Sequence, residues 1–328
     1  MSRGLSMALR LIQALYDSNS KLPVDDYKQI LKEIQLFGVS SQVYYLLKER
    51  GKFEETPKYF QVQLQQNYEQ ALYLNLFIKK QQEQVMKQFD LAGINMIPLK
   101  GTVFAEKYFG HIGARGTSDI DLLINPKQFG KAVSCIKGLG FAAEEQIKDH
   151  FHCSYSKDIP GSKIPMTIEL HWDVVKEKSS NFDIQEFWDH STIMEGYSHV
   201  RELSDYHTFY TICLHGWRHN LDSPKYFIDI LQVIYKLGGA IDYNRLLNEA
   251  STHKTLKRMV RTLSIVYEQF PHLNRICELP IKRENLHWDY RAFTDKNKRT
   301  VKKYIDFLDY YVMSYDTPIH LFKELLRK

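Results

Sequence analysis

Two aspartates, Asp119 and Asp121, alternate within the apolar segment 118–124. In a β-strand, side chains two residues apart point to the same face, so both carboxylates should lie together while the alternate apolar residues are buried on the other face. Two carboxylates at this spacing repel each other unless a cation lies between them. Their hard oxygens suit Mg²⁺, which proteins usually bind through a few carboxylates and substrate phosphates. The pattern therefore indicates a magnesium site, although two exposed aspartates at a strand edge would show the same spacing.

A glycine turn precedes the aspartates. Lys100, Gly101 and Thr102 follow a short β-rich segment, 94–99, and begin the helical stretch 103–109. A glycine lets the backbone approach a phosphate closely, and a helix N-terminus presents free N–H groups to an anion. Lys100 either neutralises phosphate charge or is an ordinary solvated lysine. The turn is thus a candidate phosphate-binding element beside the acids.

A third acid, Glu169, lies within the strand-like segment 166–172 and is flanked by apolar residues. An isolated acid on an apolar strand is costly unless it is solvated or close to a cation. Together with the glycine turn and the alternating aspartates, it makes a coherent two-metal site. Glu144, Glu145 and Asp173 are alternatives for the third carboxylate, because they are close in sequence.

These motifs resemble those of the DNA polymerase β-type nucleotidyltransferase superfamily, which has a glycine-containing helix start, an Asp-x-Asp pair and a third acid on a later strand. More closely, Leu99-Lys100-Gly101 together with residues 115–124 resembles an uncharacterised nucleotidyltransferase family with the signature LKG … R … DIDLL. The two motifs are fairly specific in combination. The helical N-terminal and C-terminal parts of that family extend the resemblance over most of the chain.

The resemblance implies a role for each matching residue. Asp119, Asp121 and Glu169 would be the catalytic, metal-binding acids, and Glu169 would help to activate the attacking hydroxyl. Thr102 departs mildly from the Gly-Ser or Gly-Gly of the superfamily, because it keeps a hydroxyl but adds a methyl group. The positions implied for nucleotide binding are Lys100, Gly101, Thr102, Arg115 and Ser118.

The implied activity is metal-dependent transfer of a nucleoside monophosphate, AMP from ATP, to a hydroxyl or similar group on a small molecule or peptide, with release of pyrophosphate. The implied cofactor is Mg²⁺, with Mn²⁺ as the alternative. In such a reaction the protein contributes position and charge rather than covalent chemistry. One other candidate is a glycosyltransferase whose Asp-x-Asp holds a nucleotide sugar, but that class has alternating β and α elements where this chain has helices. Another is a catalytically inactive binding protein, against which the three acids argue.

The elements that must position these residues follow from the apolar pattern. Helical spacing predicts one helix over 23–50, ended by Gly51, and a long helix from Pro57 to near Gly93. A β-α-β-α-β-β pattern follows, and the remainder is helical. The expected fold class is therefore α+β, with a polymerase β-type core of a small mixed sheet and helices. The predicted domains are a helical region at 1–92, the nucleotidyltransferase core at 93–178 and a helical domain at 179–328, with clear helices at 205–218 and 224–237.

Composition excludes several classes of protein. The 328 residues include 44 Lys+Arg and 39 Asp+Glu, so the net charge of +5 is too small and too dispersed to signal a nucleic-acid binder. Hydrophobic residues at 44% and charged residues at 25% exclude disorder and collagen-like repeats. The four cysteines lack CxxC spacing and are expected to be reduced. With no signal peptide and no apolar run long enough for a membrane helix, the expected location is cytoplasmic. The oligomeric state is not indicated.

Several histidines and one aspartate lie outside these motifs. His215 and His219 are four residues apart on an expected helix, a spacing that can bind zinc, but without an HExxH glutamate a packed helix face is favoured. Asp229 lies in a segment that resembles an L-x-D-L helix of the same family. It either lines a substrate pocket or caps and solvates a helix. His150 and His152 alternate on an expected strand, which is a weak signal.

Overall fold

The computed structural model describes residues 6–23, 26–145, 150–159, 165–289 and 301–325. Two compact units are distinguished by their internal contacts. The sheet unit comprises Asn67–Glu177 and Asp183–Thr208, and the helical unit comprises Met1–Gln66, Lys178–Phe182 and Phe209–Lys328. The division into domains at 1–92, 93–178 and 179–328 stays a prediction.

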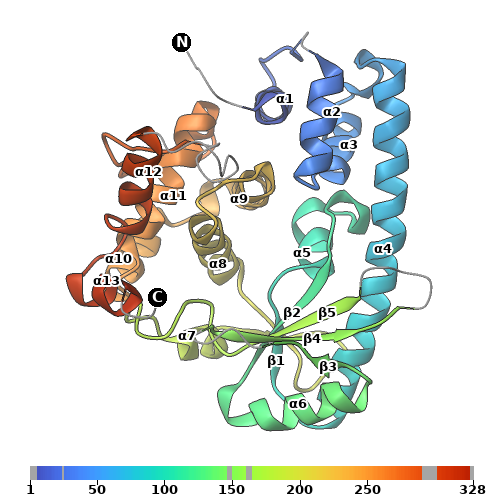
Figure 1. Ribbon diagram of the computed structural model, residues 1–328, viewed down its shortest axis with the longest axis vertical. Helices are drawn as coiled ribbons and strands as arrows, with labels where there is room; N and C mark the ends of the chain where they lie inside the picture. Colours follow the sequence, from blue (N-terminus) through green and yellow to red (C-terminus); the bar gives the residue numbers. More distant parts are fainter. Residues whose placement is uncertain (1–5, 24–25, 146–149, 160–164, 290–300, 326–328) are drawn as a thin grey trace. The chain divides into compact units, whose positions relative to one another are not determined.

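The sheet unit is built on five strands in the order β1-β2-β5-β4-β3 (Figure 1). Strands β2 and β5 are parallel, and the other neighbours are antiparallel. Helices accompany this mixed sheet, which confirms the predicted α+β class. The strands are β1 (Met96–Pro98), β2 (Asp119–Ile124), β3 (Ala142–Ala143), β4 (His152–Lys157) and β5 (Met166–His171).

One face of the sheet forms the hydrophobic core of the unit. Ile120, Leu122 and Ile124 are buried there, as the alternation in β2 predicted, and Ile168 and Leu170 of β5 join them. Helix α6 (Phe129–Gly138) lies along the sheet in Figure 1 and contributes apolar side chains to the same core. Burying each such side chain stabilises the fold by roughly 1.5–3 kcal/mol. The opposite face of β2 is therefore the one left for the aspartates.

The long predicted helix is confirmed as α4 (Lys58–Leu91), which begins after Pro57. Beyond it, Gly93 has a positive φ of 65°, the left-handed conformation in which helices commonly stop. The single helix predicted over 23–50 is wrong. It is divided at Gly38, where φ is 63°, into α2 (Tyr27–Leu36) and α3 (Ser40–Glu49). The apolar spacing continues across the break, so periodicity alone did not reveal it.

The glycine turn leads into a short helix, α5 (Thr102–Phe104), which continues as a π-helical turn, Ala105–Phe109. This matches the helical stretch predicted over 103–109. After α7 (Ile184–Asp189), strands β6 (Thr192–Ile193) and β7 (Arg201–Glu202) form a small antiparallel ladder. The sequence predicted only helices beyond residue 179, because strands of two residues are too short to show an alternating pattern.

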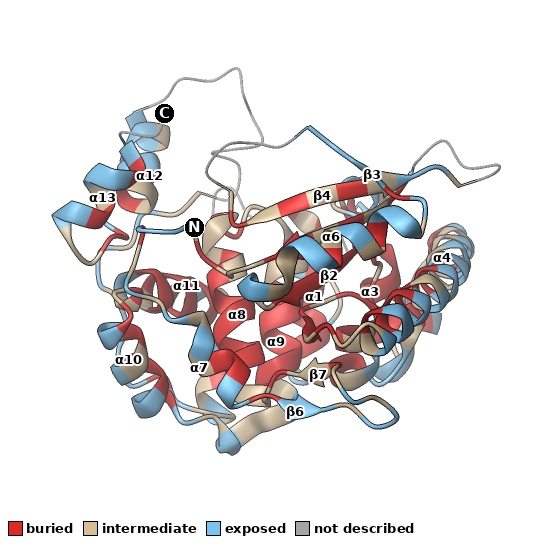
Figure 2. Ribbon diagram, turned by 90° about the horizontal axis from the view of Figure 1, so that it is seen from below, coloured by how far each residue is buried: buried red, intermediate tan, exposed pale blue. Residues whose placement is uncertain are grey.

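Most other helices belong to the helical unit. Helices α8 (Asp205–Arg218) and α9 (Pro224–Leu237) have the predicted bounds, and α9 is buried along most of its length (Figure 2). Ser223 caps α9 by accepting a hydrogen bond from the Lys225 N–H, and Pro224 occupies the first turn. The others are α1 (Met7–Tyr16), α10 (Tyr243–Thr252), α11 (Leu256–Gln269), α12 (Val301–Tyr311) and α13 (Pro318–Leu325).

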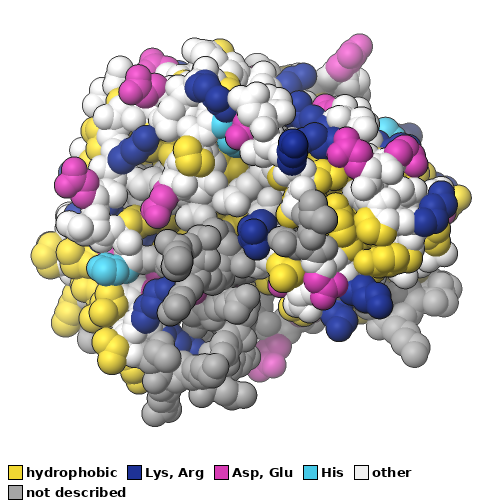
Figure 3. Space-filling view, turned by 90° about the horizontal axis from the view of Figure 1, so that it is seen from above, with side chains coloured by type: hydrophobic (Ala, Val, Ile, Leu, Met, Phe, Trp, Pro, Cys, Tyr) yellow, Lys and Arg dark blue, Asp and Glu magenta, His cyan; other side chains and the backbone are white. Residues whose placement is uncertain are grey.

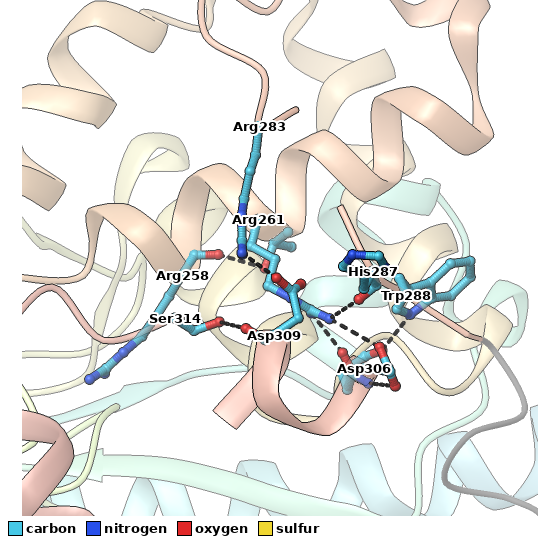
Figure 4. A network of polar contacts seen from close by, with 10 residues as sticks. Arg258, Arg261, Arg283, His287, Trp288, Asp306, Asp309 and Ser314 are labelled. Atoms are coloured by element: carbon cyan, nitrogen blue, oxygen red, sulfur yellow. Dashed lines mark hydrogen bonds and ion pairs between the residues drawn. The ribbon is translucent and has the colours of Figure 1, made fainter. Parts of the chain in front are cut away.

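A buried network of charges ties α11 to α12 in this unit (Figure 4). The Arg261 guanidinium donates to Asp309 Oδ2 at 3.0 Å and to Asn220 Oδ1 at 2.6 Å, and it lies 3.5 Å from Asp306 Oδ1. Arg283 also pairs with Asp309. The Arg261 side chain is 1% exposed, so its charge depends on these partners rather than on water.

The surface agrees with the weak net charge of the sequence. On the face shown in Figure 3, basic and acidic side chains are interspersed among the described residues. Within the described ranges, none of the helices has the length and apolarity needed to cross a bilayer. The cytoplasmic location stays a prediction.

Candidate active site

Strand register brings the polar residues of the sheet together on the face opposite the core. Asp121 on β2 is paired with Glu169 on the parallel strand β5. On the other side of β5, His152 of β4 is paired with His171. Since Asp119 precedes Asp121 by two residues, and Glu169 precedes His171 by two, all five side chains share one face. The face carries a row of carboxylates beside a pair of imidazoles.

The structure brings the three predicted acids together. Carboxylate oxygens of Asp119, Asp121 and Glu169 all lie within 4.8 Å of one another. The Asp121 side chain is buried, whereas Asp119 and Glu169 are partly exposed. Three oxygen donors at this separation fit a hard divalent cation, and the excess negative charge would favour one. Their roles as metal ligands and catalytic groups stay predictions.

The other acids considered for the third position do not join this group. Glu144 and Glu145 are exposed residues that directly follow β3. The Asp173 carboxylate accepts hydrogen bonds from the Val174 and Val175 N–H groups. Burial raises the pKa of Asp173 to about 6. Glu169 is therefore the acid that faces the two aspartates.

The glycine turn lies beside the acids. Gly101 has φ 76° and ψ −136°, a combination that only glycine adopts readily. A Cβ placed on Gly101 would lie 3.4 Å from Thr117 Cγ2 and 3.7 Å from the Asp119 carbonyl oxygen. Next to it, the Leu99 N–H donates to the Asp121 carbonyl oxygen at 3.0 Å. The turn is thus joined to the backbone of β2 at the acids.

A Gly101→Ala variant is expected to lose about 1–3 kcal/mol of unfolding free energy, because φ 76° with ψ −136° is a backbone conformation that L residues other than glycine hardly adopt. Chemical denaturation measures the change. Gly130→Ala is a matched control, since Gly130 lies in α6 with nothing within 4 Å of the added Cβ. That control should be neutral or stabilise the protein by roughly 0.5–1 kcal/mol. Equal stability of Gly101→Ala and the parent would show that the turn relaxes without strain.

Thr102 is buried behind the turn rather than presented at the surface. Its hydroxyl donates to Gln82 Oε1 on α4 at 2.8 Å, and both side chains are buried. A contact between this hydroxyl and a triphosphate, as the resemblance implies, would require that bond to break. The structure therefore supports an anchoring role for the hydroxyl, and a phosphate contact there stays a prediction.

A second anchor on α4 is Asn75, which the sequence analysis missed. Its side-chain amide donates to the carbonyl oxygens of Ile112 at 2.6 Å and Arg115 at 2.7 Å. Its Oδ1 accepts from the Thr117 N–H at 3.1 Å. All three backbone groups lie in the loop that leads into β2. Asn75 thereby determines how the loop approaches Asp119.

Replacing Asn75 by Ala should cost roughly 1–3 kcal/mol of stability, because it leaves backbone groups of the loop without their hydrogen-bond partner. The free energy of unfolding in urea is the measurement. Gln84→Ala, an exposed position on the same helix, is the control and should change stability little. If the two variants are equally stable, water replaces the amide and the anchor is unimportant.

Lys100 is not the solvated lysine that was one interpretation of the sequence. Its side chain is 13% exposed, and Nζ lies 3.1 Å from Asp121 Oδ2. Burial opposes ionisation of Asp121, but the charge of Lys100 and a hydrogen bond from His171 outweigh it and hold the pKa of that carboxyl well below its usual range. Asp121 is therefore not an exposed aspartate at a strand edge, which was the alternative interpretation of its spacing: its side chain is 2% exposed.

The remaining predicted nucleotide-binding residues are Arg115 and Ser118. Arg115 is buried, with its guanidinium carbon 5.4 Å from the centre of the Phe104 ring. The Ser118 hydroxyl donates to Asp119 Oδ1 at 3.3 Å. Ser118 therefore lies beside the acids, while Arg115 packs on an aromatic ring of α5. Nucleotide contacts by either residue stay predictions.

The main omission of the sequence analysis is His171. Its Nε2 lies 3.0 Å from Asp121 Oδ1 and 3.2 Å from Glu169 Oε2. The ring also packs against His152, with ring centroids 4.8 Å apart. The signal was present, since His171 follows Glu169 by two residues on one strand. The period-two argument applied to Asp119 and Asp121 would have placed it on the same face.

His215, His219 and Asp229 belong to the helical unit. The His215 and His219 ring centroids are 4.9 Å apart, and His219 stacks on Tyr226 at 4.7 Å. This agrees with the packed helix face that was favoured for the pair. Asp229 is buried within α9, so the interpretation as a solvated helix residue is wrong.

Comparison with known protein families gives a match over most of the chain. The sequence model of a family described as "Uncharacterised nucleotidyltransferase" matches residues 23–271. Among curated proteins, no match is found. A crystal structure of ANT(2″)-Ia in complex with adenylyl-2″-tobramycin is weakly similar, with a TM-score of 0.35 and 13% identity over 55% of this chain and 96% of that chain. A solution structure of the antibiotic-resistance factor ANT(2″)-Ia has a TM-score of 0.33 and 15% identity, over 52% and 87% respectively.

Proposed function

Because this chain belongs to the family of uncharacterised nucleotidyltransferases, whose model matches residues 23–271, we propose that it moves a nucleoside monophosphate, AMP from ATP, to an acceptor. The acceptor is a hydroxyl or similar group of a small molecule or peptide, and pyrophosphate is released. Family membership and the enzyme class were both predicted from the sequence, and the match confirms them. The nucleotide, the acceptor and the metal requirement are the proposal.

The observation that carries the proposal is the convergence of three acids beside a glycine turn. Oxygens of Asp119, Asp121 and Glu169 lie within 4.8 Å of one another. Lys100 compensates one of these negative charges through its ion pair with Asp121. The remaining negative charge repels a triphosphate unless cations are bound as well. The site therefore favours a reaction in which Mg²⁺ or Mn²⁺ accompanies the nucleotide.

The chain's own residues supply position and a base. Asp119, Asp121 and Glu169 would hold the divalent ions, which when bound neutralise charge on the phosphates. The acceptor oxygen forms a bond to the α-phosphorus while the bond to the β-phosphate oxygen breaks, and pyrophosphate leaves. The acceptor proton passes to Glu169. Burial would raise the pKa of Glu169, but the hydrogen bond from His171 and the nearby imidazoles of His171 and His152 together lower it, so that the carboxylate is ionised and can hold a cation.

Mass spectrometry of reaction products tests this function. The protein is incubated with each NTP separately, with Mg²⁺ or Mn²⁺ and a cell extract as the source of acceptors. We expect a species heavier by one NMP, most abundant with ATP, together with pyrophosphate. Omitting the metal, or using Asp119→Asn, should abolish both products. Transfer of sugar from a nucleotide sugar would instead support a glycosyltransferase, and no turnover despite nucleotide binding would indicate an inactive member of the family.

A further inference from the structure

A second group of potential ligands adjoins the three carboxylates. Ligand atoms of His152, Glu169 and His171 also lie within 4.8 Å of one another. Glu169 Oε2 is 3.2 Å from His171 Nε2 and 3.8 Å from His152 Nε2. The register explains the cluster: His152 is paired with His171 across β4 and β5, and Glu169 lies two residues before His171. Two imidazole nitrogens thus flank one carboxylate oxygen.

We propose that His152, Glu169 and His171 form a second cation position, which takes a transition-metal ion such as Mn²⁺, Co²⁺ or Zn²⁺ in preference to Mg²⁺. Imidazole nitrogen suits transition metals, whereas Mg²⁺ prefers oxygen ligands and retains water. Two histidines and one carboxylate make a donor set that leaves coordination positions open for water or substrate. Glu169 is shared with the carboxylate group, so the two positions adjoin each other.

The geometry is close to what such an ion requires. With metal–ligand bonds of about 2.0–2.2 Å, tetrahedral ligands lie ~3.4 Å apart. The two contacts of Glu169 Oε2 with the imidazole nitrogens, at 3.2 and 3.8 Å, bracket that value. The His171 ring is buried and packs against both His152 and Phe151, with centroids 4.8 and 5.8 Å away. The donors are therefore held near their binding positions, and only small shifts are needed.

This position is separable from the carboxylate group because their members differ. Asp119 belongs to the carboxylate group alone, whereas His152 belongs only to the second group. The simplest competing explanation is that His171 serves as a hydrogen-bond donor to Asp121 and Glu169 and never binds an ion. The proposal rests on the donor set and does not depend on nucleotidyl transfer, so it is tested without nucleotide or acceptor.

Titration of the full-length protein with Co²⁺ in a large excess of Mg²⁺ tests the proposal. We expect one Co²⁺ per chain, with visible absorption bands, that Mg²⁺ does not displace. His152→Gln and His171→Gln should each weaken Co²⁺ binding by at least about tenfold, since loss even of an outer partner of a ligand costs that much. Asp119→Asn should retain the ion. His190→Gln, at an exposed histidine directly after α7, is the control and should bind as the parent does.

Two results would overturn the proposal: Co²⁺ binding that survives His152→Gln, or Co²⁺ that is displaced by Mg²⁺ and lost with Asp119→Asn. Because a variant at buried His171 can fail to fold, pulsed EPR of the unaltered protein with Mn²⁺ provides an independent test. Coupling to ¹⁴N supports imidazole ligation, and its absence contradicts it. If the metal binds and no nucleotide is transferred, the proposed function fails while this site stands.

Discussion

An Asp121→Asn variant is expected to lose nucleotidyl transfer by about a thousandfold or more, because divalent ions stabilise the charge of such a transition state by several kcal/mol. The variant should also be less stable than the parent. The Asp121 side chain is 2% exposed and pairs with Lys100 Nζ at 3.1 Å and His171 Nε2 at 3.0 Å. Neutralising one partner of a buried pair leaves the other charge uncompensated, which costs about 3 kcal/mol. Product formation and urea denaturation measure the two effects.

The stability effect at Asp121 should depend on pH. The folded-state pKa of this carboxyl is well below 3.8, so its ionisation stabilises the folded protein above pH 3.8. That contribution disappears as the pH falls through the folded-state pKa. The difference in unfolding free energy between the parent and Asp121→Asn should therefore be largest near neutral pH and should shrink in acid. A difference that does not change with pH would show that the charge of Asp121 is not what stabilises the site.

Asp119→Asn is the matched comparison for Asp121→Asn. Asp119 lies on the same strand and in the same group of acids but is partly exposed. Its loss should reduce transfer to a similar extent while changing stability by less than about 1 kcal/mol. Normal activity of the Asp119→Asn variant would contradict the proposal that Asp119 binds a metal ion.

Replacing Arg261 by Met should destabilise the helical unit by about 3–5 kcal/mol, because it leaves buried acids without their partner. The guanidinium contacts Asp309 and Asp306 (Figure 4). It also donates a hydrogen bond to Asn220. Burial raises the pKa of Asp306 to about 6, against the opposing attraction of Arg261. Without Arg261, Asp306 should take up a proton more readily and recover part of the loss. The change in unfolding free energy gives the magnitude.

Arg245→Met is the control for Arg261→Met. Arg245 pairs with Glu249 one helical turn away at an exposed position, and such pairs contribute about 0.3–0.5 kcal/mol. A similar small effect for Arg261→Met would mean that Arg283, which also pairs with Asp309, compensates for the missing charge. In that case Arg261→Met combined with Arg283→Met should be far less stable than either single variant.

Much of the fold could be predicted because its signals are local. Helix α9 has its predicted bounds, since Ser223 and Pro224 mark its start in consecutive positions. The break between α2 and α3 was missed because Gly38 is a single residue within continuing helical spacing. The β6–β7 ladder was missed because its strands are too short to alternate.

The candidate site was predictable only in part. Features set within one strand could be predicted, and features set by the pairing of distant strands could not. Asp119 and Asp121 share a face because of the geometry of a single strand, so that prediction did not depend on which strands lie beside it. The choice of Glu169 over Glu144, Glu145 or Asp173 depends on β5 pairing with β2. Such a contact between residues far apart in sequence leaves no local pattern.

By itself, the sequence determined the family, the strand that carries the alternating acids and the glycine turn before it, because each depends on neighbouring residues. Tertiary structure alone decided that Asp121 is buried against Lys100 and His171. It also decided that two side chains of α4 anchor the site: Asn75 holds the loop before β2, and Gln82 holds the glycine turn. Burial and partner choice arise from packing between separate segments. Burial and the choice of partners determine the charge of the site, and neither can be predicted until those segments have folded together.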